Sequence, residues 1–571
     1  MELTTTQLGA IRPFEGTYNL QNYDQVYQDF SWEEVEKEFS WYQTGQVNMA
    51  YECIDRHVDD GYGDKVALHY INEAEEQIFT FKDIKEKSDH LASVLRKYGV
   101  KKGDNVFIFL PKNPEMYIAM IAAVKIGAVA GPLFEAFMED AVRDRISDCE
   151  GRFLITDSEL VKRVPKQELP SLETVFITEG SEKCKEDEIS LVEALAETKS
   201  ENRVIEWLEL EDRLNIHYTS GSTGKPKGIV HAHRAMIQQY QTGKWVLDLK
   251  EDDIYWCTAH PGWVTGTVYG IFAPWLNRAT IVVNGGRFNA DSWYSTIEKT
   301  GVTVWYSAPT AFRMLKAEGN EVLNEYDLRS LRHILSVGEP LNPEVITWGI
   351  EALGKRIHDT WWMTETGGQL IVNLPSEVIK PGSMGRPFPG IKVAIIDDDG
   401  NPLPNGQVGH LGIKASWPSI MREVWKNEEK YHSYFVNGWY VSGDLAILDE
   451  DGYVFFQGRS DDMINSSGER IGPFEVESKL IEHQAVAEAG VIGKPDPIRG
   501  EIVKAFIVLK NGYSPTKDLL EDIRVFVKQH LAAHSAPREI EVLDELPKTK
   551  ISGKILRREL KAREVEKEVV R

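Results

Sequence analysis

Cysteine is scarce in this sequence: 571 residues contain only Cys53, Cys149, Cys184 and Cys257. They lie far apart and form no Cys-x-x-Cys pair, which argues against a zinc site and against a disulfide framework. A reducing cytosol suits such a chain best, so we expect a cytoplasmic protein. Residues 1–16 lack the basic-then-apolar layout of a signal peptide, so export is not expected.

Positive charge is also in deficit, with 65 Lys and Arg against 89 Asp and Glu, a formal net charge of -24. Nucleic acid and anionic membranes repel such a chain at long range, so neither is expected as a partner. An anionic small molecule must therefore be held by basic groups that gather locally.

An uninterrupted apolar run is missing too. The most apolar stretch, 116–134, is nominally long enough to span a bilayer. Lys125 lies inside it, however, and Gly127 and the pair Gly131-Pro132 interrupt it. We therefore predict a buried helix followed by a short buried strand.

Internal repeats are absent, and 571 residues exceed what one hydrophobic core usually holds. Helical patterns such as 80–98 alternate with β-branched runs such as 105–110 and 152–156. This rhythm is typical of sheets covered by helices and predicts an α/β body. Residues 160–210 are richer in charge and poorer in periodicity, so we expect a surface excursion there.

The pattern of apolar and turn-forming residues changes from about Gly382. Short apolar runs joined by turns at 397–400 and 449–452 predict a small β-rich subdomain. After 458–462 comes a compact unit of normal small-domain size. Its predicted elements are helices over 473–482 and 516–531 and strands over 487–492, 502–509 and 539–543.

One loop suits a polyphosphate: Tyr218-Thr219-Ser220-Gly221-Ser222-Thr223-Gly224-Lys225-Pro226-Lys227-Gly228. Its glycines let backbone N–H groups approach phosphate oxygens, its hydroxyls add donors, and its two lysines supply positive charge. It is not a Walker A loop, because Lys225 is followed by Pro226 and Thr219 stands where that motif has glycine. Apolar runs at 214–218 and 228–231 flank it and predict a strand on each side.

Further stretches follow in a fixed order: Val337-Gly338-Glu339-Pro340, Asp359-Thr360-Trp361-Trp362-Met363-Thr364-Glu365-Thr366-Gly367, Tyr440-Val441-Ser442-Gly443-Asp444, Gly458-Arg459-Ser460-Asp461-Asp462, Ser467-Gly468-Glu469-Arg470 and Pro547-Lys548-Thr549-Lys550-Ile551-Ser552-Gly553-Lys554. Together with the opening loop they resemble the adenylate-forming acyl-CoA synthetase superfamily. The stretches 262–266 and 48–57 and the Trp361-Trp362 pair are most similar to its acetate-activating branch. The resemblance covers nearly the whole chain.

The resemblance implies a ligase that works in two steps. Acetate attacks the α-phosphorus of ATP to give acetyl-adenylate and pyrophosphate, and the CoA thiol then attacks the adenylate to give acetyl-CoA and AMP. The implied ligands are ATP, Mg²⁺ and coenzyme A. The implied fold is α/β, with a large N-terminal domain of mixed sheets (1–459, including a β-rich subdomain at 380–459), a hinge at 460–462 and a small mobile α+β C-terminal domain (463–571).

Roles at the ATP site follow from the resemblance. Glu365 is implied beside Mg²⁺ and Thr364 near the α-phosphate, and both are counted with Lys554 as catalytic. Asp444 suits the two ribose hydroxyls, with Arg459 in support. The set implied for ATP is Thr219, Ser220, Gly221, Ser222, Thr223, Gly224, Lys225, Gly338, Glu339, Pro340, Asp359, Thr360, Trp361, Trp362, Met363, Thr364, Asp444, Arg459 and Arg470.

The acid and CoA sites are assigned in the same way. Trp362 stands where branches that handle longer chains have glycine, so its indole implies a pocket for short acids. The implied pocket residues are Trp263, Val264, Thr265, Val337 and Trp362, and those implied for CoA are Thr265, Ala308, Ser467, Gly468 and Lys528. Lys528 replaces an arginine of relatives, which weakens bidentate phosphate contact.

Three further assignments concern the C-terminal unit. Asp461 matches the family's hinge, and a second cation is implied at the backbone carbonyls of Ile481, His483 and Val486. Lys554 is the lysine implied to reach the adenylation site, and a lysine acetyltransferase or deacetylase acting on it is a further implied partner. Its loop departs from acetate-activating relatives by an additional Ile551, a spacing closer to that of longer-acyl branches.

Other functions compete with this interpretation. Within the superfamily, the chain could activate propionate or medium-chain acids, and a luciferase-like oxidase has no support beyond the shared scaffold. From a different class, a regulatory protein could keep the nucleotide pocket without catalysis. Retention of Glu365, Asp444, Arg470 and Lys554 argues against that alternative.

Overall fold

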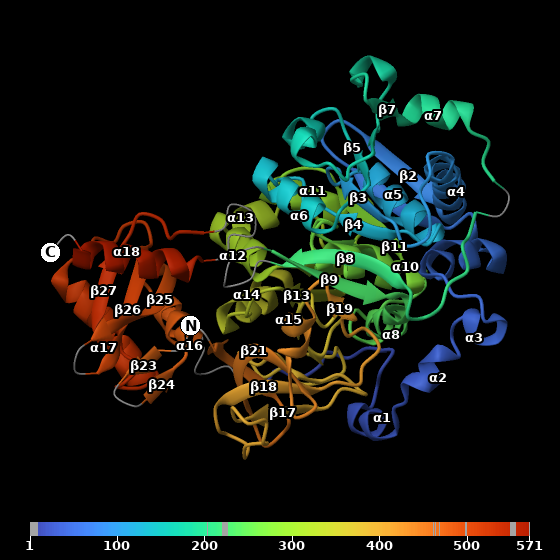
Figure 1. Cartoon of the computed structure of the whole chain (residues 1–571). Coiled ribbons are helices and arrows are strands. Elements are labelled where there is room, and N and C mark those ends of the chain that lie inside the picture. Colours follow the sequence, from blue (N-terminus) through green and yellow to red (C-terminus); the bar gives the residue numbers. More distant parts are fainter. Residues whose placement is uncertain are drawn as a thin grey trace.

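The computed structural model of the chain describes residues 9–201, 204–219, 226–460, 462, 464–466, 469–496, 499–548 and 555–569. At 465, 469, 470, 565, 566, 568 and 569 it describes the backbone alone. Figure 1 shows a large body with a smaller C-terminal unit beside it.

A nine-stranded sheet runs through the body in the order β16-β15-β14-β13-β12-β10-β11-β1-β2. The six strands from β14 to β1 in this order are parallel, and the outer strands pair antiparallel. The bounds are β1 Val66–Ile71, β2 Glu76–Thr80, β10 Ile254–Cys257, β11 Thr280–Asn284, β12 Val304–Ser307, β13 His333–Val337, β14 Ile357–Trp361, β15 Ile371–Val372 and β16 Arg386–Pro387.

An eight-stranded sheet has the order β19-β9-β8-β4-β3-β5-β6-β7. Its strands are β3 Asn105–Phe109, β4 Val129–Pro132, β5 Phe153–Thr156, β6 Thr174–Ile177, β7 Glu188–Ser190, β8 Arg213–Thr219, β9 Lys227–Ala232 and β19 Glu423–Val424. The predicted surface excursion at 160–210 was wrong, because β6 and β7 extend this sheet in parallel and α7 (Leu191–Glu197) follows them. Strands of three and four residues are too short to show a period.

Helices cover both sheets. α4 (Phe81–Lys97) starts at a capping box in which Thr80 and Asp83 bond each other's backbone N–H, and α5 (Pro114–Lys125) is capped by Asn113. α5 is buried almost all round, and β4 follows it, as predicted for 116–134. The other α-helices of the body are α1 Tyr23–Asp29, α2 Trp32–Glu36, α3 Trp41–Thr44, α6 Glu139–Asp148, α8 Met236–Trp245, α9 Val264–Thr267, α10 Ala273–Leu276, α11 Ala290–Thr300, α12 Pro309–Glu318, α13 Asn320–Leu323, α14 Pro343–Leu353 and α15 Glu428–His432.

A small antiparallel sheet follows, as the turn signals predicted. Its strands are β17 Val393–Ile396, β18 Gly409–Lys414, β20 Phe435–Val436, β21 Trp439–Leu448 and β22 Val454–Arg459. The 449–452 turn joins β21 to β22, and Gly452 has a φ of +81°, which glycine adopts without strain.

The C-terminal unit has its own hydrophobic core, to which Val476, Leu480, Val491, Ile507 and Ile523 contribute. Its elements are β23 Ile464–Ser466, β24 Glu469–Ile471, α16 Pro473–Glu482, β25 Val486–Asp496, β26 Gly500–Leu509, α17 Lys517–His530, β27 Glu539–Val542 and α18 Arg557–Val569. The five elements predicted there are confirmed. The unit contacts the body through an Asn342 Nδ2 to Ser478 Oγ hydrogen bond of 3.1 Å and through Phe456 and Phe474, whose ring centroids are 5.7 Å apart.

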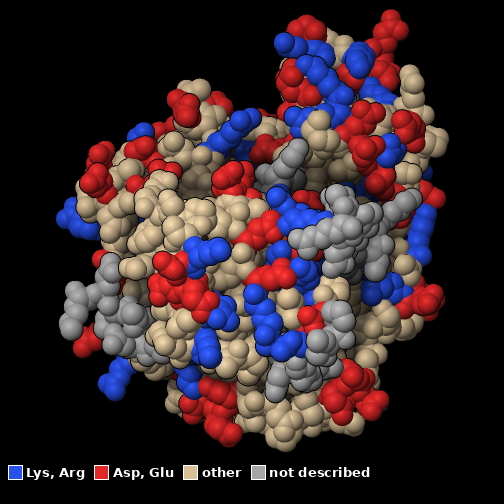
Figure 2. Space-filling view, turned by 90° about the vertical axis from the view of Figure 1, so that its left-hand side faces the viewer, with Lys and Arg blue, Asp and Glu red and all other residues tan. Residues whose placement is uncertain are grey.

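On the face drawn in Figure 2, acidic and basic side chains of the described residues are interspersed. The negative net charge of the chain therefore does not prevent basic side chains from gathering locally. Within the described ranges, no helix combines the length and the apolar character that crossing a bilayer requires.

Candidate active site

Several of the predicted site residues gather at the carboxyl ends of parallel strands. In the nine-stranded sheet β10 lies between β12 and β11, so the chain order reverses around it. Ligands of open α/β sheets bind outside the carboxyl ends of strands at such a point. The segments that follow these strands carry Trp263–Thr265 after β10, Ala308 after β12, Gly338–Pro340 after β13 and Trp362–Glu365 after β14.

Asp444 on β21 is held from two sides. Arg459 Nη1 lies 2.8 Å from its Oδ1, because the hairpin register places these two residues opposite each other. The Nε1–H of Trp361 donates to its Oδ2 over 2.9 Å, which links the small sheet to the end of β14. The carboxylate is thus oriented before any ligand arrives and retains acceptor capacity for hydroxyl donors.

Glu365 is buried beside the base of the predicted phosphate loop. The Tyr434 hydroxyl donates to its Oε1 over 3.1 Å, and no salt bridge of Glu365 is found among the described residues. Lys227, the first residue of β9, acts on Glu365 electrostatically, and burial lowers the pKa of this lysine. Mg²⁺ is commonly held by one or two carboxylates plus phosphates, and a buried carboxylate with an oxygen to spare fits that requirement.

Thr364 is fixed by its backbone. His231 Nε2 lies 2.7 Å from the Thr364 carbonyl oxygen and Nδ1 lies 3.1 Å from that of Ser419, and burial lowers the pKa of His231 to about 4. β9 therefore contacts the segment that follows β14.

The segment after β13 is held through Glu339. Its two carboxylate oxygens accept from the Thr310 hydroxyl over 2.7 and 2.8 Å, and Arg313 Nη2 bonds one of them over 2.7 Å. Both partners lie on α12. Gly338 has a φ of +92°, which lets the chain turn sharply after the strand.

Asp359 and Thr360 pair with Ser336 and Val337 in the β13–β14 register, so the residues predicted to border adenine lie on neighbouring strands. The Thr360 hydroxyl donates to the Ser336 carbonyl and is directed into the protein. Asp359 Oδ1 has no hydrogen-bond partner within the described part of the chain, and burial raises the pKa of Asp359 to about 8. The protonated form of this carboxyl therefore predominates at pH 7.

Trp362 is almost fully buried in the body core, which Val337 shares and against which Val264 packs. Its ring lies 5.0 Å from that of Tyr269, on the helical segment that continues α9. Three of the predicted acyl-pocket residues thus lie in or against the same hydrophobic core. Trp263, in contrast, is 37% exposed and packs on Phe134 and Phe137.

Comparisons with known proteins agree with this geometry. A sequence model described as AMP-binding enzyme matches residues 55–425, and one described as AMP-binding enzyme C-terminal domain matches residues 475–554. The chain belongs to the AMP-binding enzyme family. The assignment to the adenylate-forming superfamily and the predicted α/β fold class are therefore confirmed.

Two curated relatives are similar to this chain in sequence over most of their length. An acetyl-coenzyme A synthetase of Bacillus subtilis (strain 168) is 61% identical over 98% of this chain and 98% of its own. One of Rubrobacter xylanophilus is 41% identical over 91% and 84%. Among solved structures, a Brucella canis acyl-CoA synthetase has a TM-score of 0.76 at 34% identity, covering 96% of this chain and 100% of that one. An anthranilate CoA ligase in complex with anthranoyl-AMP has a TM-score of 0.84 at 30% identity, covering 92% and 98%.

Several of the residues predicted to form the site lie outside the described residues: Ser220, Gly221, Ser222, Thr223, Gly224, Lys225, Asp461, Ser467, Gly468 and Lys554. Arg470 is described by its backbone alone, in β24. The Thr219–Lys227 pair closes the base of the first loop, and a bridge between Lys548 and Ile555 joins the flanks of the last one.

The remaining predicted residues lie in the C-terminal unit. Lys528 is exposed near the end of α17. Ile481 lies in the last turn of α16, His483 is the first residue after it, and Val486 begins β25. The His483 ring accepts from the Ala485 N–H and bonds Asp522, and its carbonyl accepts from the Val486 N–H.

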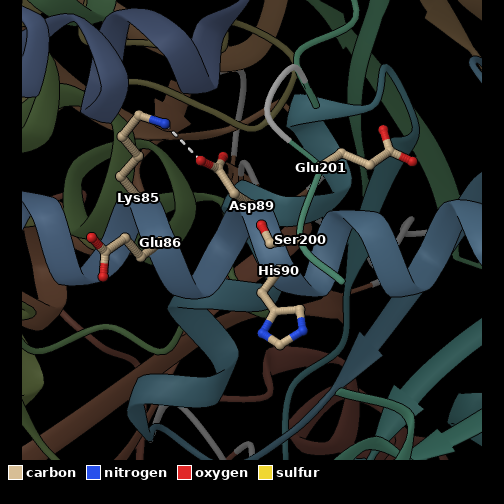
Figure 3. A pocket seen from close by; sticks show the side chains of 6 residues that line it. All are labelled: Lys85, Glu86, Asp89, His90, Ser200 and Glu201. Carbon is tan, nitrogen blue, oxygen red and sulfur yellow. Dashed lines mark hydrogen bonds and ion pairs between the residues drawn. The ribbon is translucent and has the colours of Figure 1, made fainter. Parts of the chain in front are cut away.

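Other contributors were not predicted from the sequence. Tyr434, His231, Thr310, Arg313 and Tyr306 orient site residues but stand in no motif. A surface hollow elsewhere is lined by Lys85, Glu86, Asp89, His90, Ser200 and Glu201 (Figure 3). These side chains come from α4 and from the segment after α7, and none follows the strand ends that form the candidate site.

Proposed function

We propose that this chain is an AMP-forming acetate–CoA ligase. It converts acetate and ATP into acetyl-adenylate and pyrophosphate, and then transfers the acetyl group to CoA, releasing AMP. The observation that carries the proposal is the whole-length identity of 61% to an acetyl-coenzyme A synthetase, combined with an indole buried at the end of β14.

In the first half-reaction, an acetate oxygen attacks the α-phosphorus and the bond to the bridging oxygen of pyrophosphate breaks. Asp444, oriented by Trp361 and Arg459, binds the ribose hydroxyls. Gly338–Pro340 and Asp359 border the adenine, and Thr364 lies near the α-phosphate. Glu365 would hold Mg²⁺, which would neutralise phosphate charge.

The positively charged ammonium group of Lys554 offsets the negative charge that develops on the attacked phosphate and on the carboxylate. A preorganised donor of this kind is worth about 3 to 4 kcal/mol in well-studied oxyanion sites. In the second half-reaction, the CoA sulfur attacks the acyl carbonyl, the thiol loses its proton and AMP leaves. Acetylation of Lys554 would remove its charge and stop the first half-reaction, so an acetyltransferase and a deacetylase would regulate the enzyme through this residue.

The deciding experiment measures ATP–pyrophosphate exchange with acetate, propionate and butyrate, on the wild type and on Lys554→Ala. We expect exchange to be fastest with acetate, weaker with propionate, and lost in the variant. Because one methylene is discriminated by only about 1 to 3 kcal/mol, propionate should be a poorer but real substrate. Faster exchange with butyrate than with acetate would contradict the proposed substrate, and undiminished exchange in the variant would contradict the role of Lys554.

A further inference from the structure

Tyr306 lies directly behind the indole that the proposed function assigns to the acid pocket. It is on β12, in the middle of the nine-stranded sheet, and is fully buried. Its hydroxyl has three partners: Trp362 Nε1 at 3.3 Å, Gln369 Nε2 at 3.1 Å and Thr360 Oγ1 at 2.7 Å. Tyr306 itself stands in none of the motifs of the sequence.

The donors and acceptors in this cluster fix the direction of every bond. Indole and amide N–H groups only donate, so Trp362 and Gln369 occupy the two lone pairs of the Tyr306 oxygen. The Thr360 hydroxyl donates to the Ser336 carbonyl over 2.7 Å. The Tyr306 proton must therefore go to Thr360 Oγ1, and all of the hydrogen-bonding capacity of the phenol is used. A buried phenol whose donor and acceptors are all engaged is held rigidly.

A second tyrosine holds the other side of the indole. Tyr269 contacts Trp362 edge to face, with centroids 5.0 Å apart, and contacts Tyr306 at 5.7 Å. Its hydroxyl accepts from the backbone N–H of Gln369 over 2.7 Å and bonds Thr242 over 2.9 Å. Gln369 thus joins the two tyrosines, through its side chain to one and through its backbone to the other.

We infer that Tyr306 is a positioning residue for acid specificity: its hydroxyl locks the Trp362 indole in the orientation that limits acyl chain length. This inference rests on the proposed function. Because the cluster also reaches Thr360, it connects the acid pocket to the strand that borders the nucleotide. Without the Tyr306 hydroxyl, the Trp362 indole N–H loses its hydrogen-bond acceptor and the ring can turn within the core. The pocket then discriminates less strongly against longer acids.

The test compares kcat/KM for acetate, propionate and butyrate in the wild type, Tyr306→Phe and Trp362→Gly. In Tyr306→Phe we expect the propionate-to-acetate ratio to rise roughly five-fold, the equivalent of one average hydrogen bond. The matched control is Tyr294→Phe on α11, where the buried hydroxyl has no hydrogen-bond partner within the described ranges. This control should leave the ratio unchanged.

A second variant, Gln369→Met, provides an independent test if Tyr306→Phe does not fold. Gln369→Met removes the amide donor to Tyr306 but keeps the backbone N–H that reaches Tyr269. It should shift the ratio in the same direction, and the effects of the two substitutions should not add, as expected for partners in one network.

The outcomes separate the inference from the function on which it rests. A wild type that does not activate acetate refutes the proposed function, and an unchanged ratio in Trp362→Gly refutes the pocket assignment. If the ratio changes in Trp362→Gly but stays at the wild-type value in Tyr306→Phe and Gln369→Met, Tyr306 is only a structural residue and the inference is overturned.

Discussion

At the scale of single residues, Asp444 gives a direct test of the nucleotide site. In Asp444→Asn the amide oxygen can still accept from Trp361, but the charge that orients Arg459 and binds two hydroxyls is gone. Hydrogen bonds to charged groups are worth about 1.5 to 3 kcal/mol, so the KM for ATP should rise tenfold or more. Steady-state kinetics with varied ATP measure this, with the exposed Asp398→Asn as the control. Equal KM values in the two variants would exclude a ribose role.

Asp359 predicts a distinctive pH dependence of stability. Its carboxyl ionises near 3.8 when unfolded, but burial raises its pKa to about 8 in the folded protein. Between these values the folded state binds more protons, so stability falls as pH rises from 4 to 8 and changes no further above that. Asp359→Asn removes this titration, so its free energy of unfolding relative to the wild type should increase across that window, by up to about 5 kcal/mol. Urea unfolding from pH 4.5 to 8.5 measures it.

Asp253 provides a control of opposite sign. Arg332 holds the pKa of this buried carboxyl below its usual range in spite of burial. Its contribution is present above the unfolded pKa and is lost as pH falls through the folded one. Asp253→Asn should therefore be less stable than the wild type at neutral pH, with a difference that shrinks on acidification. Parallel pH profiles for the two variants would show that neither carboxyl titrates as the structure implies.

At the scale of elements, Lys125 joins α5 to its neighbours. Fully buried at the end of this helix, its Nζ bonds Asp55 over 2.8 Å and Asp89 of α4 over 2.5 Å. Figure 3 shows Asp89 also reaching Lys85. The same lysine made the apolar stretch 116–134 unsuitable as a membrane span.

Lys125→Met leaves two buried carboxylates without their main cation. Breaking a buried pair in this way costs about 3 to 5 kcal/mol, which urea unfolding should detect. Lys87→Met, on the exposed face of α4, is the control and should stay within about 0.5 kcal/mol of the wild type. Burial raises the pKa of Asp55, so the defect should diminish as pH falls and the Asp55 carboxyl takes up a proton. A pH-independent loss would point to packing instead of charge.

Elements with strong local signals could be predicted from the sequence. The helix at 473–482 has proline at its first position and a clear apolar period, and its predicted bounds match α16. β6 and β7 could not be predicted, because strands this short are defined by pairing with β5 and with each other. Pairing depends on the neighbouring strands, and a three-residue segment is too short to show an alternation of apolar and polar residues.

At the scale of the whole molecule, several motif residues gather because they follow strand ends, where the topology brings them together. Asp444 and Trp361 meet in space although 83 positions separate them. Arg313, Tyr306 and Tyr434 could not be predicted, since each acts from the interior of an element or loop whose approach depends on strand order. The contributions of Ser220–Lys225 and of Lys554 stay predictions.

The relation between the two units is the last prediction. Among the described residues, the C-terminal unit touches the body through Asn342 with Ser478 and Phe456 with Phe474. We propose that this unit changes pose between the half-reactions. Hinge positions absorb changes in φ and ψ, and Asp461 matches the family's hinge. Proline there fixes φ, so Asp461→Pro should impair transfer from acetyl-adenylate to CoA more than acetate-dependent pyrophosphate exchange. Asp461→Ala, which leaves φ free, should retain both activities, and an equal loss of both in the proline variant would argue against domain alternation.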